Sequence, residues 1–201
     1  EDIMAEQFQF PEDFMRCAEF HGHICPGLSI GYRAAKAGLE KLQSQRSEDE
    51  ELVAIVETDA CGVDAVQVLT GCTFGKGNFL YKDMGKQAFT FIDRNSGQGV
   101  RLCMLPEGFA PEGRHQELLS RVMQGLATEE EKQEFATLHQ EASRRVLDMP
   151  LHSLFSVHTG EFAIPDKARI ASSQCCDQCG EPTMQSKLVE KQGRNLCRDC
   201  V

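Results

Sequence analysis

The chain has 201 residues, of which 41% are hydrophobic and 26% charged, so its composition is that of an ordinary globular protein with one sizeable core. Its formal net charge of −10 argues against broad electrostatic attraction to nucleic acid or to anionic membranes. No apolar run approaches the roughly 20 residues that span a bilayer, and no basic segment leads into an apolar one, so we expect a cytoplasmic protein without a membrane anchor.

The sequence contains ten cysteines, a number that would indicate disulfides in a small secreted protein. Most of them, however, lie near histidines or in Cys-x-x-Cys spacing, which is typical of metal ligands. We therefore expect a reducing compartment and metal ligation rather than a disulfide framework.

Two imidazoles and a thiol lie within five residues near the start of the chain, at His21, His23 and Cys25. A helix that begins after Pro11 is expected to end at this loop, and Pro26 fits the first position of a second helix. Cys25 would then lie at a helix N-terminus, where the dipole favours the thiolate as a ligand or as a nucleophile. The group indicates half of a transition-metal site; the alternative is a His and a Cys that merely pack in a tight turn.

The second half of the site is expected from a later segment. The second helix, over 27–43, has one apolar face and many small residues, which permit close approach of another backbone. The β-branched run 52–56 predicts a buried strand, and a polar loop with Asp59 and Cys61 follows it.

A second thiol, Cys72, follows Cys61 by eleven residues. We expect the two to meet the first loop around one transition metal, Zn, Fe or Ni, with an open coordination position. The candidate ligands of this core site are His21, His23, Cys25, Cys61 and Cys72.

A Gly-rich segment surrounds Cys72. The pattern Gly71-x3-Gly75-Lys76-Gly77 is one residue short of a Walker A loop and has Gly77 where Ser or Thr would hold magnesium, which disfavours a P-loop NTPase. Binding of a smaller anion by Lys76 and Thr73 stays open.

The following elements complete a layered domain. Strand-like runs over 89–92 and 100–104 predict a hairpin, and helices are expected over 111–125 and from a capping box at Thr128 to Pro150. A last strand is predicted over 151–157. Helices interspersed with strands favour an α+β fold, a mixed or antiparallel sheet with packed helices, over residues 1–165.

Two Cys-x-x-Cys pairs, separated by seventeen residues, lie at the end of the chain. This spacing predicts a structural zinc in a small ribbon domain over 173–201, after a linker over 166–172. A redox pair is the alternative, and Cys175 is a spare thiol that could replace Cys176. The four expected zinc ligands are Cys176, Cys179, Cys197 and Cys200.

The spacing of this tail resembles the zinc knuckle of DksA/TraR-type proteins. Its acidic and basic residues balance, and a tetrathiolate zinc adds negative charge. Nucleic-acid binding is therefore disfavoured, and contact with a protein partner or a purely structural role is favoured.

Three stretches, 20–27, 59–67 and 70–78, resemble in this order the FmdE-like family, which takes its name from formylmethanofuran dehydrogenase. The resemblance covers most of residues 10–160 and implies an α+β core, an intertwined homodimer and a His/Cys metal site. The family name implies association with a molybdenum or tungsten enzyme of one-carbon metabolism. Nothing in the chain resembles a pterin-binding or iron–sulfur domain, so we do not expect the redox reaction itself here.

Three functions follow as hypotheses. The first is a metal-binding accessory or sensor protein with a core site and a structural zinc. The second is an enzyme for a small anionic substrate, in which Cys61, Cys25 or a metal-bound water attacks. His21 or His23 would act as the base, and Asp59 or Asp64 would orient it. The third is a zinc-finger regulator that binds protein or nucleic acid.

The remaining histidines and thiols receive structural interpretations. His115 and His139 lie on helices that look polar, so we expect them to be solvated. Cys17 and Cys103 lie in apolar surroundings, where a thiol usually packs as a small hydrophobic group.

Overall fold

The computed structural model describes residues 9–168 and 170–201. The chain divides into two compact units, which we call the core unit (up to Lys167) and the tail unit (from Ala168). Within the described residues, no helix is both long and apolar enough to cross a bilayer.

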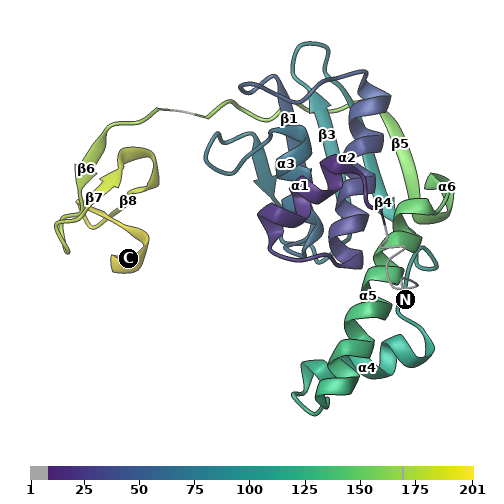
Figure 1. Ribbon diagram of the computed structural model, residues 1–201. Coiled ribbons are helices and arrows are strands. Elements are labelled where there is room, and N and C mark those ends of the chain that lie inside the picture. Colours follow the sequence, from purple (N-terminus) through teal and green to yellow (C-terminus); the bar gives the residue numbers. More distant parts are fainter. Residues whose placement is uncertain (1–8, 169) are drawn as a thin grey trace. The chain divides into compact units, whose positions relative to one another are not determined.

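The core unit is built on one five-stranded mixed sheet with the strand order β2-β1-β3-β4-β5 (Figure 1). The strands pair antiparallel except β1 and β2, which run parallel. The predicted α+β class is confirmed, and so is the hairpin, which β3 and β4 form. The strands are β1 (Leu52–Val56), β2 (Phe79–Tyr81), β3 (Ala88–Asp93), β4 (Gln98–Met104) and β5 (Phe155–Glu161).

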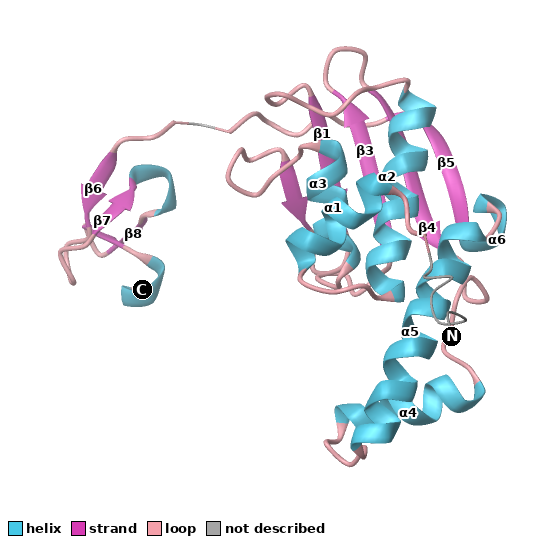
Figure 2. Cartoon of the chain, in the orientation of Figure 1, coloured by secondary structure: helices cyan, strands magenta, loops and turns pink. Residues whose placement is uncertain are grey.

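Among the residues that the structure describes, six helices accompany the sheet, and α2 is the central one because it contacts α1, α3, α5 and the strands β3 and β4 (Figure 2). Helices α4 and α5 pair as a helical hairpin that extends past the end of the sheet. The helices are α1 (Glu12–His21), α2 (Pro26–Leu42), α3 (Gly62–Thr70), α4 (Gly113–Met123), α5 (Glu129–Asp148) and α6 (Leu151–Leu154).

Small residues on α2 let it lie close to the sheet. Ala34 and Ala35 are fully buried, and a Cβ added to Gly38 would lie 2.3 Å from the ring of Phe91. The aromatic rings of Phe89 and Phe91 fill the space beneath the helix, and both are fully buried. Burying such side chains contributes roughly 1.5–3 kcal/mol each, so this layer dominates the core.

The start of the last strand differs from the prediction. Residues 151–154 form the short helix α6, and β5 begins only at Phe155. Pro150 occupies the N-cap position with φ −58°, and its carbonyl accepts a hydrogen bond from the Ser153 N–H, which starts a helical turn before the chain extends.

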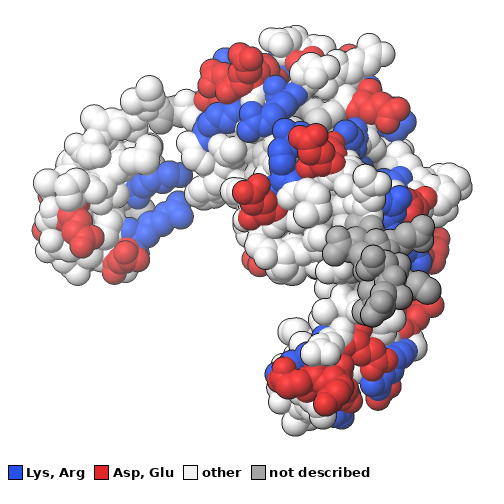
Figure 3. All heavy atoms as spheres, in the orientation of Figure 1, with Lys and Arg blue, Asp and Glu red and all other residues white. Residues whose placement is uncertain are grey.

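The helical hairpin of α4 and α5 is held by charged pairs on its surface and by histidines inside it. The predicted capping box of Thr128 and Glu131 is confirmed, and acidic and basic side chains alternate over the hairpin (Figure 3). The expectation that His115 and His139 are solvated is wrong. His115 is 7% exposed, and its Nε2 lies 2.9 Å from Nδ1 of His139, with the Phe135 ring against both imidazoles.

Asn78 ties the entry of β1 to the loop that precedes β2. Its amide donates to the carbonyls of Asp49 and Leu52 at 3.0 and 2.9 Å and accepts from the Thr73 N–H at 3.0 Å, in full burial. Asn78→Ala is expected to lower the free energy of unfolding by about 2–4 kcal/mol, because it leaves buried polar groups without partners. Urea unfolding measures this. Asn95→Ala, at an exposed turn position, is the control and should stay within about 0.5 kcal/mol; equal losses would contradict the prediction.

The tail unit consists of two short hairpins and two turns of 3-10 helix. Strand β6 pairs with β7, and β8 pairs with β9, both antiparallel. The elements are β6 (Ser173–Cys175), β7 (Pro182–Met184), η1 (Gln185–Lys187), β8 (Val189–Lys191), β9 (Arg194–Leu196) and η2 (Arg198–Cys200).

Candidate metal centres

Three side chains from three helix ends converge in the core unit. His21 is the last residue of α1, Cys25 is the N-cap of α2 and Cys61 is the N-cap of α3. One potential ligand atom from each lies within 4.8 Å of the others. The structure thus brings the first loop and the loop after β1 to one point, although they are far apart in the sequence.

Glycines at the crossing of α2 and α3 make this convergence possible. A Cβ added to Gly31 would lie 2.0 Å from the carbonyl oxygen of Gly62, so the two backbones touch there. A Cβ on Gly27 would lie 3.2 Å from Cβ of Cys61 and 3.9 Å from Sγ of Cys25. Larger residues at these positions would push α3 away and separate the two thiols.

Asp64 orients the His21 ring. Its Oδ2 lies 2.6 Å from His21 Nδ1, and Nε2 of the same ring lies 3.8 Å from Sγ of Cys25. With the Nδ1–H donating to the carboxylate, Nε2 presents its lone pair toward the two thiols. A carboxylate on the far nitrogen is the usual arrangement behind a metal-bound histidine, since it fixes the tautomer and raises the basicity of the ligand.

Burial, and not the helix dipole, dominates the acidity of Cys25. The thiol is 4% exposed, and this desolvation raises its pKa to about 12, although the Leu28 N–H donates to Sγ at 3.3 Å. The expectation of a thiolate stabilised by the helix N-terminus is therefore corrected for the metal-free protein. Such a thiol is a poor nucleophile, whereas a metal ion can displace its proton.

The donor set fits a borderline or soft transition metal. One imidazole and two thiols match zinc and also iron or nickel. Three protein ligands leave a fourth tetrahedral position, as in catalytic or ligand-binding zinc sites. His23 is exposed beside this group, with its ring centroid 4.4 Å from that of His21, and it is not among the three convergent ligands.

The structure does not bring Cys72 to this centre, which corrects the prediction. Its side chain is fully buried in the main core, where Sγ donates to the carbonyl of Leu52 at 3.3 Å. Burial raises the pKa of this thiol to about 11. Cys72 faces the core because it lies beside the entry of β1, away from the helix ends that carry the other ligands.

Lys76 and Thr73 close a loop instead of forming an anion site. The Lys76 ammonium donates to three backbone carbonyls, those of residues 47, 48 and 49, at 3.0–3.3 Å. The Thr73 hydroxyl accepts from the Lys76 N–H at 3.3 Å. These contacts already engage the Lys76 ammonium, so the geometry gives no support to the weak anion-binding prediction, which stays a prediction.

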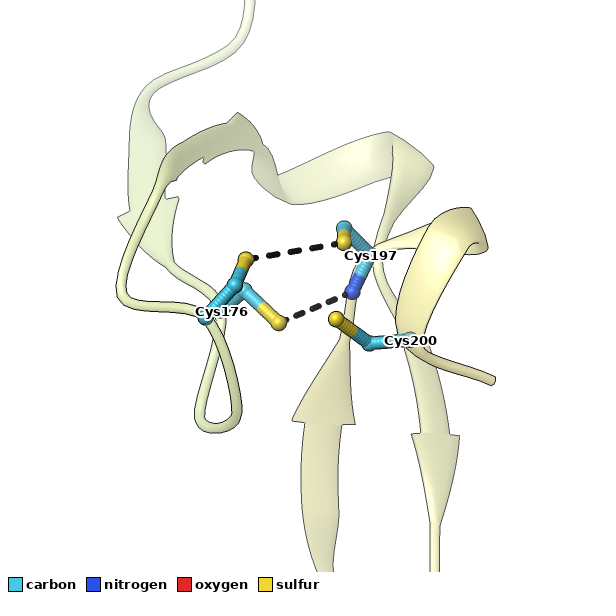
Figure 4. A group of neighbouring side chains, drawn as sticks. Cys176, Cys197 and Cys200 are labelled. Atoms are coloured by element: carbon cyan, nitrogen blue, oxygen red, sulfur yellow. Dashed lines mark hydrogen bonds between the residues drawn. The ribbon is translucent and has the colours of Figure 1, made fainter.

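The four paired cysteines of the tail unit form a second group. One sulfur from each of them lies within 4.8 Å of the others. Figure 4 shows Cys176, Cys197 and Cys200 pointing toward one another, with the Cys197 N–H donating to Sγ of Cys176 at 3.3 Å. Cys175 is exposed and lies outside the group, so Cys176 takes the position that the sequence left open between them.

Backbone amides favour the thiolate form of Cys176, which is the form that binds a metal. The N–H groups of Cys179, Cys197 and Gln178 point at its sulfur and lower the pKa of the thiol to about 6. Gly180, with φ +75°, closes the first Cys-x-x-Cys turn in the left-handed region that glycine adopts without strain. Four thiol ligands in this spacing fit a closed tetrahedral zinc site.

The contribution of Asp64 to the core centre can be tested directly. Asp64→Asn is expected to weaken binding of the core metal by about 10- to 100-fold, because His21 loses the carboxylate that fixes its orientation. Competition titration of zinc against a chromophoric chelator measures the affinity. Asp83→Asn, at an exposed carboxyl that accepts from the Tyr81 hydroxyl, should leave it unchanged. Equal affinities for Asp64→Asn and the unmodified chain would exclude this role.

Comparison with known proteins finds a matching family and a similar crystal structure. Residues 20–156 match the family model described as FmdE, Molybdenum formylmethanofuran dehydrogenase operon. A tungsten formylmethanofuran dehydrogenase FmdE-like protein from Syntrophus aciditrophicus has a similar crystal structure, with a TM-score of 0.58 and 25% identity over 94% of this chain and 89% of that one.

A curated relative was also found in Archaeoglobus fulgidus. It is described as a probable S-adenosyl-L-methionine-binding protein and is 34% identical over 196 residues, which cover 93% of this chain. The chain spans only about half of that relative, 52% of its length.

Proposed function

Because this chain belongs to the FmdE family, we propose that it is a metal-binding accessory or sensor protein with one transition metal in the core unit and one structural zinc in the tail unit. The observation that carries the proposal is the convergence of His21, Cys25 and Cys61, whose ligand atoms lie within 4.8 Å of one another. The Asp64 carboxylate behind His21 supports it further, since an orienting carboxylate is costly to arrange around a histidine that only packs.

A role beside an enzyme of one-carbon metabolism is part of the same proposal. It is supported by the description of the matching family and by the name of the Syntrophus aciditrophicus protein, both of which refer to formylmethanofuran dehydrogenase. The S-adenosyl-L-methionine binding ascribed to the Archaeoglobus fulgidus protein is not carried over, because this chain matches only 52% of that protein.

Metal analysis of the protein tests the proposal. Protein prepared under reducing conditions should contain two metal ions per chain, and Cys61→Ser should contain one. Cys103→Ser, at a partly buried thiol on β4, should keep both. A single metal per chain, still present in Cys61→Ser and lost when the tail cysteines are replaced, would overturn it.

The open fourth position favours a second candidate, an enzyme in which the core metal activates water or a small substrate. His23 is exposed next to His21 and would act as the base, with Cys61 and Asp59 as the other candidate catalytic groups. Cobalt-substituted protein distinguishes the two candidates. If the fourth position is open, added azide binds the cobalt ion and changes its visible absorption spectrum. An unchanged spectrum would indicate a closed site and would exclude this alternative.

We also propose that the protein acts as a homodimer, as the family resemblance implies. Exposed apolar side chains on the hairpin of α4 and α5 support a protein contact there, since Met123 and Leu126 are 79% and 61% exposed. Light scattering after gel filtration should give twice the mass of the 22.4 kDa chain. A monomer at micromolar concentration would contradict it.

A further inference from the structure

Two of the three convergent ligands in the core unit are thiols, and their sulfur atoms are neighbours. Sγ of Cys25 and Sγ of Cys61 lie within 4.8 Å of each other, at the N-cap positions of α2 and α3. A Cβ added to Gly27 would lie 3.9 Å from the first sulfur and 3.7 Å from the second, so both sulfurs face the same glycine. The glycine brings no side chain into the space between them.

The gap between these sulfurs is one that side-chain rotation shortens. A disulfide needs a sulfur–sulfur distance of about 2.05 Å, and each sulfur turns about its own Cα–Cβ bond. Other thiols of the core unit are tied to the backbone instead. Cys17 and Cys72 are fully buried, and their sulfurs donate to the carbonyls of Asp13 and Leu52 at 3.2 and 3.3 Å.

The two thiols differ in exposure, which sets the order in which they react. Cys61 is partly exposed, whereas Cys25 is 4% exposed. A small oxidant therefore meets the Cys61 sulfur first, and the Cys25 sulfur lies close enough to complete a disulfide. Three protein ligands leave an open tetrahedral position beside these sulfurs, whereas the four thiolates of the tail unit fill theirs. Oxidation is therefore expected at the core centre before the tail.

We propose that Cys25 and Cys61 are an oxidation site, at which a peroxide converts the two thiolates into a reversible disulfide and thereby releases the core metal. The inference rests on the proposed core metal and adds its regulation. The thiolate is the form of cysteine that binds a metal, so the disulfide leaves His21 as the remaining member of the three-ligand set. Reduction by a small thiol restores both donors.

The reaction balances with hydrogen peroxide as the oxidant. The Cys61 thiolate attacks one peroxide oxygen, the O–O bond breaks and a hydroxide leaves, which makes a sulfenic acid at Cys61. The Cys25 thiolate then attacks the Cys61 sulfur, the S–O bond breaks and a second hydroxide leaves. Two electrons pass from the two sulfurs to the peroxide, and the metal ion leaves with its charge unchanged.

Peroxide titration of the reduced, metal-loaded full chain tests the proposal. One equivalent of hydrogen peroxide should release one metal ion per chain to a chromophoric chelator and link the tryptic peptides 17–33 and 47–76. Fragmentation of the linked peptides assigns the bond, because Cys17 and Cys72 lie on the same two peptides. Dithiothreitol should reverse both changes, and Cys103→Ser, the matched control, should respond as the unmodified chain does.

The metal content measured before peroxide is added separates the two possible failures. Absence of the core metal at that stage would count against the proposed function. A core metal that stays bound, with Cys25 and Cys61 both still open to alkylation, would overturn the oxidation site alone. A disulfide confined to the tail cysteines would overturn it equally.

Two variants test the order of attack with dimedone, which traps sulfenic acids. Cys25→Ser has no second sulfur to complete the disulfide, so peroxide should leave a dimedone adduct on Cys61. Cys61→Ser should give at least tenfold less adduct on Cys25, because that sulfur is buried. Equal adducts in the two variants, or no adduct on Cys61, would overturn the assignment of Cys61 as the attacking sulfur.

Discussion

Replacing Cys200 with serine is expected to unfold the tail unit while the core unit stays folded. The tail unit buries few apolar side chains, chiefly Leu196 with the sulfurs of Cys176 and Cys197. Segments shorter than about 40 residues seldom fold without a metal or disulfides, and a structural zinc contributes about 10–16 kcal/mol in comparable peptides. Loss of one thiolate removes most of that free energy.

Amide hydrogen exchange measures the effect residue by residue. In Cys200→Ser, the amides of β8 and β9 should exchange as in an unfolded chain, while those of β1 and β3 keep their protection. Cys175→Ser is the matched control, because this exposed thiol lies outside the cluster and its loss should change nothing. Protection of the tail amides that survives in Cys200→Ser would show that the tail folds without a complete zinc site.

Of the glycine-to-alanine substitutions in the described part of the core unit, Gly31→Ala is expected to lower the stability of the protein most. The added Cβ would meet the carbonyl oxygen of Gly62 at 2.0 Å, and because the obstacle is backbone, only a separation of α2 from α3 relieves the clash. Overpacking of this kind typically costs about 1–3 kcal/mol and exceeds that when backbones collide. The same separation moves Cys61 away from Cys25, so stability and metal binding should fall together.

Urea unfolding and metal analysis on one preparation test both parts. Gly31→Ala should lose about 3 kcal/mol and the core metal but keep the tail zinc. Gly75→Ala provides the control, since nothing lies within 4 Å of its added Cβ, and it should stay within about 0.5 kcal/mol with both metals bound. A Gly31→Ala protein that retains the core metal would show that the helix crossing does not position the ligands.

Those features of the core centre that depend on short stretches of sequence could be predicted. Pro26 behind Cys25 predicted the helix start that directs the thiol, and the small residues of 27–43 predicted a close backbone approach. The identity of the partner backbone, α3 through Gly62, required the fold. Asp64 was one of two carboxylates predicted to orient a histidine, but its pairing with His21 depends on which face of α3 points to α1.

The predictions for Cys72 and His139 were wrong because the direction in which each side chain points could not be read from the sequence. Cys72 has the residue type and spacing of a ligand, yet the turn that follows α3 directs its sulfur into the main core. His139 was taken as solvated because histidine counts as polar in a hydropathy pattern. Its position four residues after Phe135 places both on one face of α5, and that spacing is the signal that could have identified the contact between His139 and the buried His115.

The donors of the core centre have a further consequence that concerns the order of assembly. His21, Cys25, Cys61 and the carboxylate of Asp64 all precede β2, β3, β4 and β5 along the chain. During synthesis, the full set of donor atoms leaves the ribosome before four of the five strands exist. Ion capture therefore does not have to wait for the sheet, and a nascent chain that holds its ion early would present the crossing of α2 and α3 as a template on which the later strands condense.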